Sequence, residues 1–442
     1  MSFVYIKTYG CQMNEYDSEV IAGILQEEGY ELTSELKKAD IVLVNTCYVR
    51  EKVKQKVFSF LGELKKIKKE KPSLILGVGG CLSQKDPEEI KKRAPFVDII
   101  WGTSNFHRLP EFLKIVKKEK KSVVNVEEED LPHLLPAKRK RKFSVFVPVM
   151  RGCNNFCSYC NVPYVRGREK SRPPDVILKE IKDAVSEGCR EVVLLGQNVN
   201  SYGKDLEEKI DFADLLSEVN RVEGLCRIRF TTSHPKDLSE KLILQMAYLD
   251  KVCEHLHLPL QAGSNKILKL MRRCYTREDY LKLVEKVRLF IPDIALTTDI
   301  IVGFPGETEK DFEDTLWMLE KVRFDGAFTF AYSPIPGTRA AGFENQVPLE
   351  VKKKRLRRLI QFQQKITEEK NRAFVGKEVE VLVEGPSKKD PGILEGRTRH
   401  NKIIVFKGEK HLIGELVRVK VEEAGCWALK GRLVEKKEKI FL

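Results

Sequence analysis

The sequence predicts an α/β protein of three parts: an N-terminal three-layer domain around a parallel sheet, a central partial (β/α)6 barrel and a small C-terminal antiparallel β-barrel. Three observations predict it. Apolar strands alternate with amphipathic helices over residues 1–135, a strand–helix unit repeats six times over residues 143–372, and short alternating strands occupy residues 375–442. Alternating strands and helices imply parallel sheets covered by helices, whereas closely spaced short strands favour a small barrel. At 442 residues the chain is long enough for two or three domains.

The N-terminal segment alternates between short apolar runs and longer amphipathic ones. These runs predict strands at 3–7, 41–45, 74–78 and 99–101, and helices at 18–28, 51–69 and 87–92. This alternation is typical of a parallel sheet with helices on its faces. A Pro- and Lys-rich segment, residues 131–142, is predicted to link this domain to the next.

The central segment repeats the strand–helix pattern. Strands are predicted at 144–149, 191–195, 227–230, 255–258, 294–301 and 327–331, and helices at 175–187, 212–222, 238–249, 277–290 and 310–321. Six such units suggest a partial or open β/α barrel, whose chemistry lies at the C-terminal ends of its strands. A long basic helix, from about residue 349 to 373, is predicted to lead out of this barrel.

The C-terminal segment has the period-two pattern of strands. Five are predicted, at 378–383, 392–395, 402–406, 415–421 and 428–434. Short strands at this spacing favour a small barrel. Because the segment is also basic, we expect it to be a platform for RNA.

The bulk composition narrows the class of protein. The formal net charge is +14, so the surface is expected to attract a polyanion. The N-terminus lacks the layout of a signal peptide, and no uncharged apolar run approaches membrane-spanning length. Eleven cysteines in such a chain suit a reducing cytosol, where clustered thiols are metal ligands rather than disulfides. We therefore expect a cytoplasmic protein with no membrane partner.

Three cysteines, Cys153, Cys157 and Cys160, directly follow the first predicted strand of the central barrel. Thiolates this close can bind three corners of a [4Fe-4S] cluster and leave the fourth iron open to an outside ligand. A zinc site normally takes four ligands, and no histidine is close in sequence to complete one. The Cys-x3-Cys-x2-Cys spacing resembles the signature of the radical S-adenosylmethionine (SAM) enzymes, in which the amino and carboxylate groups of SAM chelate the fourth iron.

A second set of cysteines is indicated by topology. Cys11, Cys47 and Cys81 each follow the C-terminal end of a predicted strand in the N-terminal domain. Loops at that edge of a parallel sheet gather at one crevice, so these thiols are predicted to hold a second three-cysteine cluster. Gly79 and Gly80 would let the backbone approach it closely. The other five cysteines, which show no grouping, are expected to be packing residues.

Several motifs together resemble the methylthiotransferase family of radical SAM enzymes, and within it the MiaB branch, which modifies tRNA. The matching segments are residues 8–14, 151–169, 195–199 and 302–308, and the likeness covers essentially the whole chain. That branch usually has Ile and Thr where this chain has Asn161 and Ser158, a departure that affects no cluster ligand. The resemblance implies an N-terminal three-cysteine domain, a radical SAM barrel and a C-terminal TRAM domain.

The resemblance also implies a reaction. Sulfur and a methyl group are inserted at C2 of the N6-prenylated adenosine just 3′ of the anticodon, by radical SAM chemistry with two [4Fe-4S] clusters. Cleavage of SAM at the barrel cluster would give a radical that removes the C2 hydrogen, and the second cluster would supply methylated sulfur. The implied partners are the anticodon loop of tRNA, an external electron donor and a sulfur donor. We expect a monomer, and no catalytic base is assigned.

Contacts to SAM and tRNA are predicted at motif positions. Tyr159, Gln197, Asn198 and Gly303 are the predicted SAM contacts, because they lie in the cysteine loop or at the ends of predicted strands. The predicted tRNA contacts are basic side chains near the cysteines or in the C-terminal segment, namely Arg166, Arg168, Arg397 and Arg399. Histidines at strand ends, such as His234, are expected to be packed residues rather than ligands.

Three other functions compete with this one. One sibling branch acts on an aspartate of a ribosomal protein, and another acts on threonylcarbamoyl-adenosine in tRNA. Arg151, the segment 164–167 and a basic C-terminal domain argue against the first, and Arg151 argues against the second, which tends to carry an acidic residue there. A non-catalytic RNA-binding protein with structural metal would need neither open iron sites nor a six-unit barrel.

Overall fold

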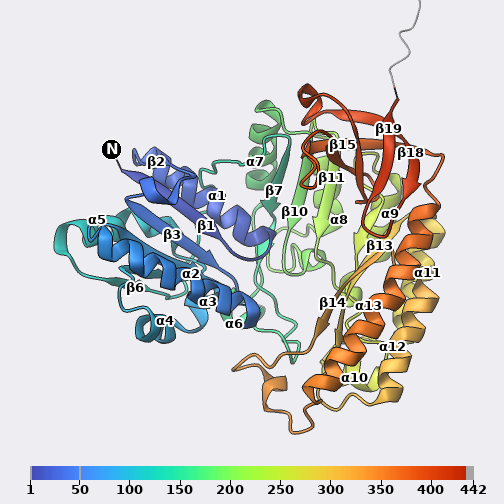
Figure 1. The fold of residues 1–442 in the computed structure, drawn as a ribbon. Helices are drawn as coiled ribbons and strands as arrows, with labels where there is room; N and C mark the ends of the chain where they lie inside the picture. The colour runs from blue at the N-terminus through green and yellow to red at the C-terminus, as the bar shows by residue number, and fades with distance from the viewer. Residues whose placement is uncertain (1, 49–50, 435–442) are drawn as a thin grey trace, which may run out of the picture.

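The computed structural model describes residues 2–48 and 51–434 and has the three predicted parts (Figure 1). An N-terminal parallel sheet, a central partial barrel and a closed C-terminal barrel follow one another along the chain. The predicted α/β fold class is therefore confirmed. The end of the predicted C-terminal domain, residues 435–442, lies outside the described residues.

The N-terminal sheet has the strand order β2-β1-β3-β4-β5-β6, with every pair parallel. Its strands are β1 (Phe3–Thr8), β2 (Glu31–Leu32), β3 (Ile41–Thr46), β4 (Ile75–Gly80), β5 (Ile99–Trp101) and β6 (Val123–Asn125). The central strands β3 and β4 are buried along their whole length. Burial on both faces explains why they appear in the sequence as apolar runs. The short edge strands β2 and β6 carry no such signal and were not predicted.

Helices cover both faces of this sheet and make the three-layer domain. On one face lie α1 (Gln12–Glu27) and α5 (Leu109–Glu119), which pack through residues such as Ile21 and Phe112. On the other face lie α2 (Glu51–Glu70), the short α3 (Cys81–Lys85) and α4 (Pro87–Arg93). The carboxyl ends of the strands are left open between the layers.

The central barrel consists of two three-stranded parallel sheets, β7-β10-β11 and β12-β13-β14. An isolated bridge from Ile228 to Val252 connects the two sheets into one curved, open barrel, and a second bridge, from Gln261 to Ile300, lies within the β12-β13-β14 sheet. The strands are β7 (Ser144–Pro148), β10 (Glu191–Leu195), β11 (Arg227–Thr231), β12 (His255–His257), β13 (Ala295–Val302) and β14 (Gly326–Ala331). The prediction of six strand–helix units matches this arrangement.

Helices on the outside cover this barrel. They are α7 (Pro174–Ser186), α8 (Phe212–Asn220), α9 (Glu240–Tyr248), α10 (Asn265–Leu270), α11 (Arg277–Phe290), α12 (Glu309–Val322) and α13 (Leu349–Arg372). Three of them, α8, α11 and α12, begin with a capping box, in which the N-cap side chain and an aspartate three residues later satisfy each other's backbone N–H groups. The caps explain the sharp starts of these helices. The shorter α6 (Val162–Val165), β8 (Met150–Arg151) and β9 (Lys170–Ser171) flank the cysteine loop.

The C-terminal barrel is closed, with the order β15-β16-β17-β19-β18. Its strands are β15 (Glu378–Pro386), β16 (Leu394–Thr398), β17 (Ile403–Lys407), β18 (Leu416–Ala424) and β19 (Leu429–Leu433). All neighbouring pairs are antiparallel, as predicted, except β17 and β19, which are parallel. An odd number of strands forces this exception, because directions cannot alternate all the way around a closed ring.

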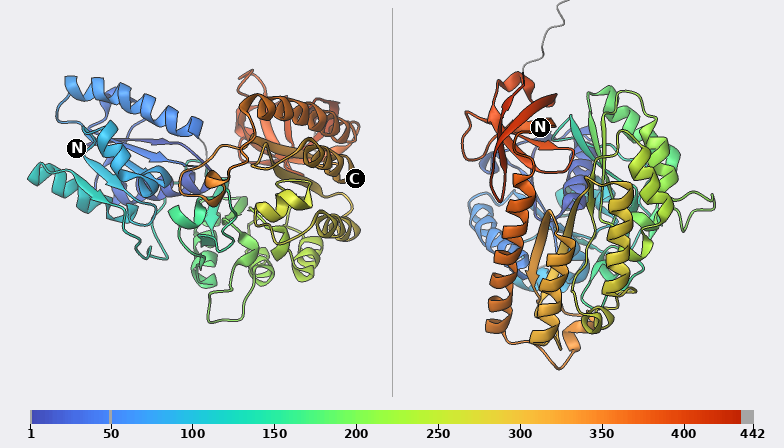
Figure 2. Two further views of the ribbon diagram at one scale, coloured as in Figure 1. Left: turned by 90° about the horizontal axis from the view of Figure 1, so that it is seen from below. Right: turned by 90° about the vertical axis from the view of Figure 1, so that its right-hand side faces the viewer.

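The C-terminal barrel packs on the N-terminal ends of the central strands. Arg227 and Arg229, at the start of β11, donate hydrogen bonds to the carbonyl oxygens of Arg397, Thr398 and Arg399 at 2.7–2.9 Å. The turn between β16 and β17 thus closes the end of the central barrel that is opposite the cysteines. Figure 2 shows the N-terminal domain and the C-terminal barrel on different sides of the central barrel.

The N-terminal domain packs beside the open edge of the central barrel. Met13 of α1 lies in a small cluster with Val193 and Leu195 of β10. The segment that follows β14 also returns to this domain, where Ile335 packs against its core. Among the described residues, no helix has the length and apolar character that crossing a membrane requires.

Gly79 provides a test of the packing under the second cysteine set. A Cβ at this position of β4 would overlap the indole ring of Trp101, whereas a Cβ at Gly62, inside α2, meets nothing within 4 Å. We expect Gly79→Ala to destabilise the N-terminal domain by about 1–3 kcal/mol through overpacking. Gly62→Ala should instead stabilise it by about 0.5–1 kcal/mol. Calorimetric midpoints of the two variants measure this difference, and a Gly79→Ala midpoint at or above that of the wild type would contradict it.

Candidate functional site

The first cysteine set lies at the C-terminal end of the first central strand. Cys153 follows β8, and its backbone N–H donates to the carbonyl of Gly167 at 3.2 Å. Gly152 has a φ of +76°, and a Cβ there would overlap the backbone of Arg168. The loop can fold so tightly only because this position is glycine. Its thiols are free, and those of Cys153 and Cys157 are buried.

The three thiols of this loop influence one another electrostatically. Burial, with a contribution from Cys157, raises the pKa of Cys153 to about 11. Burial and then Cys157 raise the pKa of Cys160 to about 12. The raised pKa values keep Cys153 and Cys160 protonated at neutral pH unless a metal cation displaces the protons.

The donor set fits an iron–sulfur cube better than a single ion. Among the described residues, no three His, Cys, Asp or Glu side chains converge closely enough to ligate one metal ion. A [4Fe-4S] cluster instead binds each thiolate at a different iron, so its ligands lie near one another without converging. Three soft thiolates on one loop are the donors that such a cluster takes.

A buried arginine supports this loop, and no sequence pattern predicted it. Arg273 comes from the loop between α10 and α11, and its Nη1 lies 3.6 Å from Cys157 Sγ. The same guanidinium donates to the carbonyl of Pro259 at 3.1 Å and to the hydroxyl of Tyr275 at 3.0 Å. A fixed cation beside a thiolate ligand favours the charged form of that ligand. Arg273 lies outside every motif of the sequence analysis, so only the fold brings it here.

The predicted SAM contacts Gln197 and Asn198 lie beside the cysteine loop. Gln197 Oε1 accepts a hydrogen bond from the N–H of Gly152 at 2.6 Å. Asn198 donates to Asp237 at 2.8 Å, while its Oδ1 is buried without a partner among the described residues. The hydroxyls of Thr232 and Ser233, just after β11, are likewise buried and unsatisfied there.

These unsatisfied groups fit a polar ligand at the strand ends. A buried polar atom without a hydrogen bond is costly, so such atoms mark a place where a bound molecule supplies the missing bond. Sequence reasoning missed Thr232 and Ser233. Their position at the end of the third central strand was the available signal.

The other two predicted SAM contacts have local partners. Tyr159 packs against a small apolar cluster that includes Met271 and Phe304. Gly303, with a φ of +69°, donates its N–H to Glu307 at 2.8 Å and leaves room for the side chain of Lys352. These contacts account for both positions structurally, and their roles toward SAM stay predictions.

The second cysteine set gathers at one edge of the N-terminal sheet. Cys11 is the N-cap of α1 after β1, Cys47 follows β3 and Cys81 begins α3 after β4. These three strands are neighbours in the sheet. A Cβ at Gly10 would lie 2.7 Å from Cys47 Cβ, and the charges of Cys11 and Cys81 act on each other. The topology thus brings together the residues that the sequence placed at one crevice.

Asn14 joins the loops that carry these cysteines. Its fully buried side chain donates to the carbonyl oxygens of Thr46 at 2.8 Å and Tyr9 at 3.2 Å, and its Oδ1 accepts from Arg166 at 2.8 Å. Cys11 Sγ lies 3.6 Å from the same oxygen. One asparagine therefore fixes two loops of the sheet edge and a residue of the central domain.

The two cysteine sets face each other across the domain interface. Asn161, next to Cys160, donates to the carbonyl of Tyr48, next to Cys47, at 2.9 Å. Thr103 also donates to the carbonyl of Val165 at 2.6 Å. Asn161 is one of the positions where this chain departs from the family pattern, and here it links the two cysteine loops directly.

The four arginines predicted to contact tRNA all have protein partners. Arg166 is buried in an ion pair with Asp17, and the guanidinium of Arg168 lies 4.3 Å from the ring of Phe156. In the C-terminal barrel, Arg397 pairs with Glu384 at 3.0 Å and Arg399 with Glu254 at 2.7 Å. The last two lie at the end of the barrel opposite the cysteines. Contact of any of the four with RNA stays a prediction.

Comparison with known families divides the chain into the same three regions. Residues 3–102 match the Uncharacterized protein family UPF0004, residues 147–319 match the Radical SAM superfamily and residues 372–434 match the TRAM domain. The first match covers the second cysteine set, and the second match covers the barrel loop.

Curated relatives match nearly the whole chain. A tRNA-2-methylthio-N(6)-dimethylallyladenosine synthase of Moorella thermoacetica is 53% identical over 97% of this chain and 98% of its own. Proteins of the same description from Clostridium botulinum and Acetivibrio thermocellus are each 54% identical, over 97% of this chain and 96% and 90% of theirs.

Solved structures share the fold at low identity. The radical S-adenosylmethionine methyltransferase TsrM of Kitasatospora setae matches with a TM-score of 0.56 and 15% identity, covering 77% of this chain and 75% of its own. The cobalamin-dependent radical enzyme OxsB matches with a TM-score of 0.52 and 15% identity, covering 83% and 56%.

His234 predicts a specific acid sensitivity of the barrel end. Burial, aided by Arg273, lowers the pKa of His234 to about 2, so below pH 6.5 the unfolded chain binds a proton that the folded chain does not. Stability should therefore fall as pH drops, by about 1.4 kcal/mol per pH unit below 6.5. His234→Asn, which keeps an acceptor for the N–H of Lys236, should flatten the loss between pH 6.5 and 5. Urea unfolding at both pH values measures it.

The control for this prediction is His411→Asn. His411 is exposed at the surface of the C-terminal barrel, with 69% of its side chain accessible. This variant should keep the pH dependence of the wild type. Equal pH dependence in His234→Asn and the wild type would contradict the assignment to His234.

Proposed function

The chain belongs to the family of tRNA-2-methylthio-N(6)-dimethylallyladenosine synthases, which are radical SAM enzymes, and we propose that it adds a methylthio group to C2 of the N6-prenylated adenosine just 3′ of the anticodon. Relatives that match nearly the whole chain at 53–54% identity show that it belongs to this family. The observation that supports the specific reaction is the pair of cysteine sets held face to face by hydrogen bonds between their loops. Removing a hydrogen and adding a methylthio group at the same carbon needs both cysteine sets next to one substrate base.

The proposed cofactors are SAM and two [4Fe-4S] clusters. Cys153, Cys157 and Cys160 would hold the barrel cluster, and Cys11, Cys47 and Cys81 the auxiliary cluster. When bound, these groups supply the cleavage of an unactivated aromatic C–H bond and the sulfur that replaces it, because no side chain is basic enough to remove that hydrogen. The protein holds both sets at a fixed separation and buries Cys47, Cys81, Cys153 and Cys157, while Cys11 is exposed.

The proposed SAM site lies at the ends of the central strands. Gln197 and Asn198 would contact SAM from the end of β10, and Tyr159 and Gly303 from the opposite wall. The unsatisfied Asn198 Oδ1 and Ser233 hydroxyl support a polar ligand at this place. Gln197 also anchors Gly152, so it would join the ligand site to the cysteine loop.

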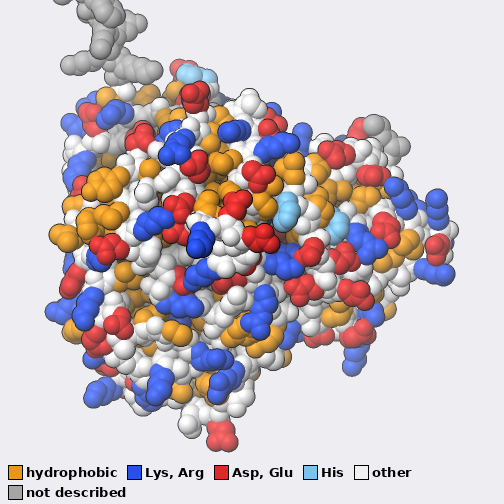
Figure 3. All heavy atoms as spheres, turned by 180° about the vertical axis from the view of Figure 1, so that it is seen from behind, with side chains coloured by type: hydrophobic (Ala, Val, Ile, Leu, Met, Phe, Trp, Pro, Cys, Tyr) orange, Lys and Arg blue, Asp and Glu red, His pale blue; other side chains and the backbone are white. Residues whose placement is uncertain are grey.

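The proposed substrate is the anticodon loop of tRNA, whose unpaired bases can be turned out without melting a helix. Arg168, Arg397 and Arg399 are proposed contacts at the exposed or partly exposed surface, whereas Arg166, the fourth predicted contact, is buried against Asp17. On the face in Figure 3, basic and acidic side chains are interspersed. The net charge of +14 therefore does not form a single basic patch on that face. An electron donor, a sulfur donor, a monomeric state and a cytoplasmic location complete the proposal.

Domain boundaries are proposed as 1–135 for the N-terminal domain, 143–372 for the radical SAM barrel and 375–442 for the TRAM domain. The start of β7 at Ser144 and the end of α13 at Arg372 support the central limits. Expressed fragments with these ends should be the natural units for later domain experiments.

The substrate is tested by mass spectrometry of tRNA from cells that lack the gene. We expect prenylated adenosine without its methylthio group to accumulate, and the wild-type gene to restore the modification. Unaltered tRNA with an unmodified ribosomal-protein aspartate would assign the chain to the first sibling branch. Threonylcarbamoyl-adenosine lacking a methylthio group would assign it to the second.

The division of labour between the cysteine sets is tested with single variants. Cys157→Ala should abolish release of 5′-deoxyadenosine, because it removes a ligand at the SAM site. Cys11→Ala should keep that release but block methylthio product, because it affects only the auxiliary site. Cys226→Ala, far from both sets, serves as the control and should keep both activities. Equal loss of 5′-deoxyadenosine in Cys157→Ala and Cys11→Ala would contradict the assignment.

A further inference from the structure

We infer that Arg166 completes the auxiliary site: the central domain supplies it as a buried cation that sets the reduction potential of a cluster held by the N-terminal domain. This inference rests on the proposed auxiliary cluster and adds a positioning residue to it. Arg166 was predicted from the sequence to contact tRNA phosphate. Its surroundings in the structure point to the cysteines instead.

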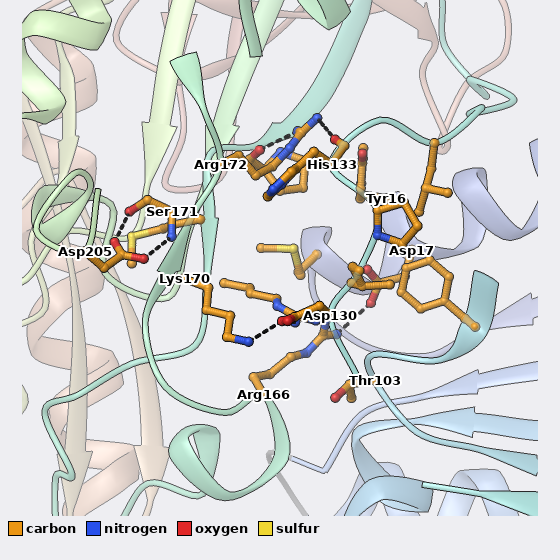
Figure 4. A pocket seen from close by; sticks show the side chains of 18 of the residues that line it. Tyr16, Asp17, Thr103, Asp130, His133, Arg166, Lys170, Ser171, Arg172 and Asp205 are labelled. Carbon is orange, nitrogen blue, oxygen red and sulfur yellow. Dashed lines mark hydrogen bonds and ion pairs between the residues drawn. The ribbon is translucent and has the colours of Figure 1, made fainter. Parts of the chain in front are cut away.

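Arg166 reaches the auxiliary site from the barrel cysteine loop. It directly follows α6, six residues after Cys160, and only 7% of its side chain is exposed. Its Nη2 lies 2.8 Å from a carboxylate oxygen of Asp17 and 2.8 Å from Asn14 Oδ1. Figure 4 shows the guanidinium pointing toward Asp17 of α1. Two charge-assisted bonds of this length fix the orientation of the planar group.

The guanidinium also lies next to the auxiliary thiols. Cys11 Sγ lies 3.6 Å from the Asn14 oxygen that accepts from Arg166, and Arg166 is also a charge and hydrogen-bond partner of Cys81. Asp17, and after it Cys81 and Cys11, favour the charged form of Arg166. Asp17 acts on Cys81 more weakly than Arg166 does. Arg166 therefore places a positive charge beside the cysteines, and Asp17 holds the guanidinium in place.

Charge balance explains why this position needs a cation. Three thiolates and a carboxylate around one site repel one another, and each electron added to a cluster increases the negative charge. A fixed cation in a medium of low dielectric constant lowers this cost more than an exposed one would. Arg166 should therefore favour the reduced auxiliary cluster and raise its potential.

The ion pair also forms part of a cavity wall. A cavity of about 470 Å³ between the N-terminal domain, the linker and the central barrel is lined by both Asp17 and Arg166 (Figure 4). Arg172 lines the same cavity, where it pairs with Glu180 at 2.8 Å and donates to the carbonyl oxygens of Pro148 and His133. Arg172 is thus a matched control, because it is a cation paired with a buried carboxylate at the same interface.

The experiment is a redox titration of the full chain, reconstituted anaerobically and followed by electron paramagnetic resonance. Signals of the auxiliary cluster are assigned with a variant in which Cys153, Cys157 and Cys160 are all alanine. Arg166→Gln should make reduction of the auxiliary cluster at least tenfold less favourable, about 59 mV lower for one electron. Arg166→Lys, which keeps the charge, should stay within threefold of the wild type, as should Arg172→Gln. The barrel cluster should not shift in any of them.

Three results of this titration would contradict the inference or the function on which it rests. If the wild-type chain binds a single cluster, the proposed function itself fails before Arg166 is considered. If two clusters form and Arg166→Gln leaves the auxiliary potential unchanged while weakening tRNA binding, Arg166 acts on the substrate and the inference is wrong. A shift in Arg166→Lys equal to that in Arg166→Gln would also overturn it, because charge would not be the cause.

Loss of the cluster is informative as well. Iron analysis that shows the auxiliary cluster missing in Arg166→Gln but present in Arg166→Lys and Arg172→Gln would support the need for a cation at this position. Absence of that cluster in all three variants would show only general sensitivity of the interface, and would count against the inference.

Discussion

The arrangement depends on one constraint: the carboxyl edges of two separate parallel sheets must face each other and stay at a fixed distance. Each edge gathers three cysteines, one set from neighbouring loops of the N-terminal sheet and one from a single loop of the central barrel. Neither sheet determines the distance between the sets. Hydrogen bonds from Asn161 to Tyr48 and from Thr103 to Val165, with the contacts of Arg166, determine it instead. These bonds are buried, so losing one leaves an unsatisfied polar group and costs more than a surface contact would.

The opposite end of the central barrel is closed by a different kind of interface. Arg227, Arg229 and Arg399 are paired with carboxylates or backbone carbonyls where the C-terminal barrel docks. Breaking a buried charge pair is expensive, so this barrel is held as a fixed part of the molecule. A tRNA bound to this barrel would therefore lie at a fixed distance from the sheet edge that carries the cysteines. Because these arginines already pair with protein groups at the interface, fewer of their hydrogen-bond donors are available to RNA.

Local sequence signals were reliable where the structure is repetitive. The central strands and helices were predicted almost to the residue, because each is long enough to show its period and several begin with capping residues. The edge strands β2 and β6 and the helix α10 were not predicted, because two to six residues are too few for a period to appear. The helix α5 was also missed, although its 11 residues are enough to show one. The parallel pair β17–β19 was missed for another reason: it follows from closing an odd number of strands, which is a property of the whole ring. For the site, cysteines were found because spacing and strand order are local, but Arg273 and Asn14 were not, because neither lies in a pattern that points to metal.

The sequence by itself determined three things. It indicated two sets of three thiols that could do the chemistry, the family to which the chain belongs, and the edge of each sheet where those thiols would lie. Chain order and strand periodicity are sufficient for that, since parallel strands must deliver their following loops to one edge. Only the tertiary structure decided what surrounds the thiols. Arg166 appears in the sequence as one more exposed cation near a nucleic-acid enzyme's active loop, and folding places it among Asp17, Asn14 and Cys81. Burial and partners depend on residues about 150 and 85 positions away, and no local pattern encodes contacts across a domain interface.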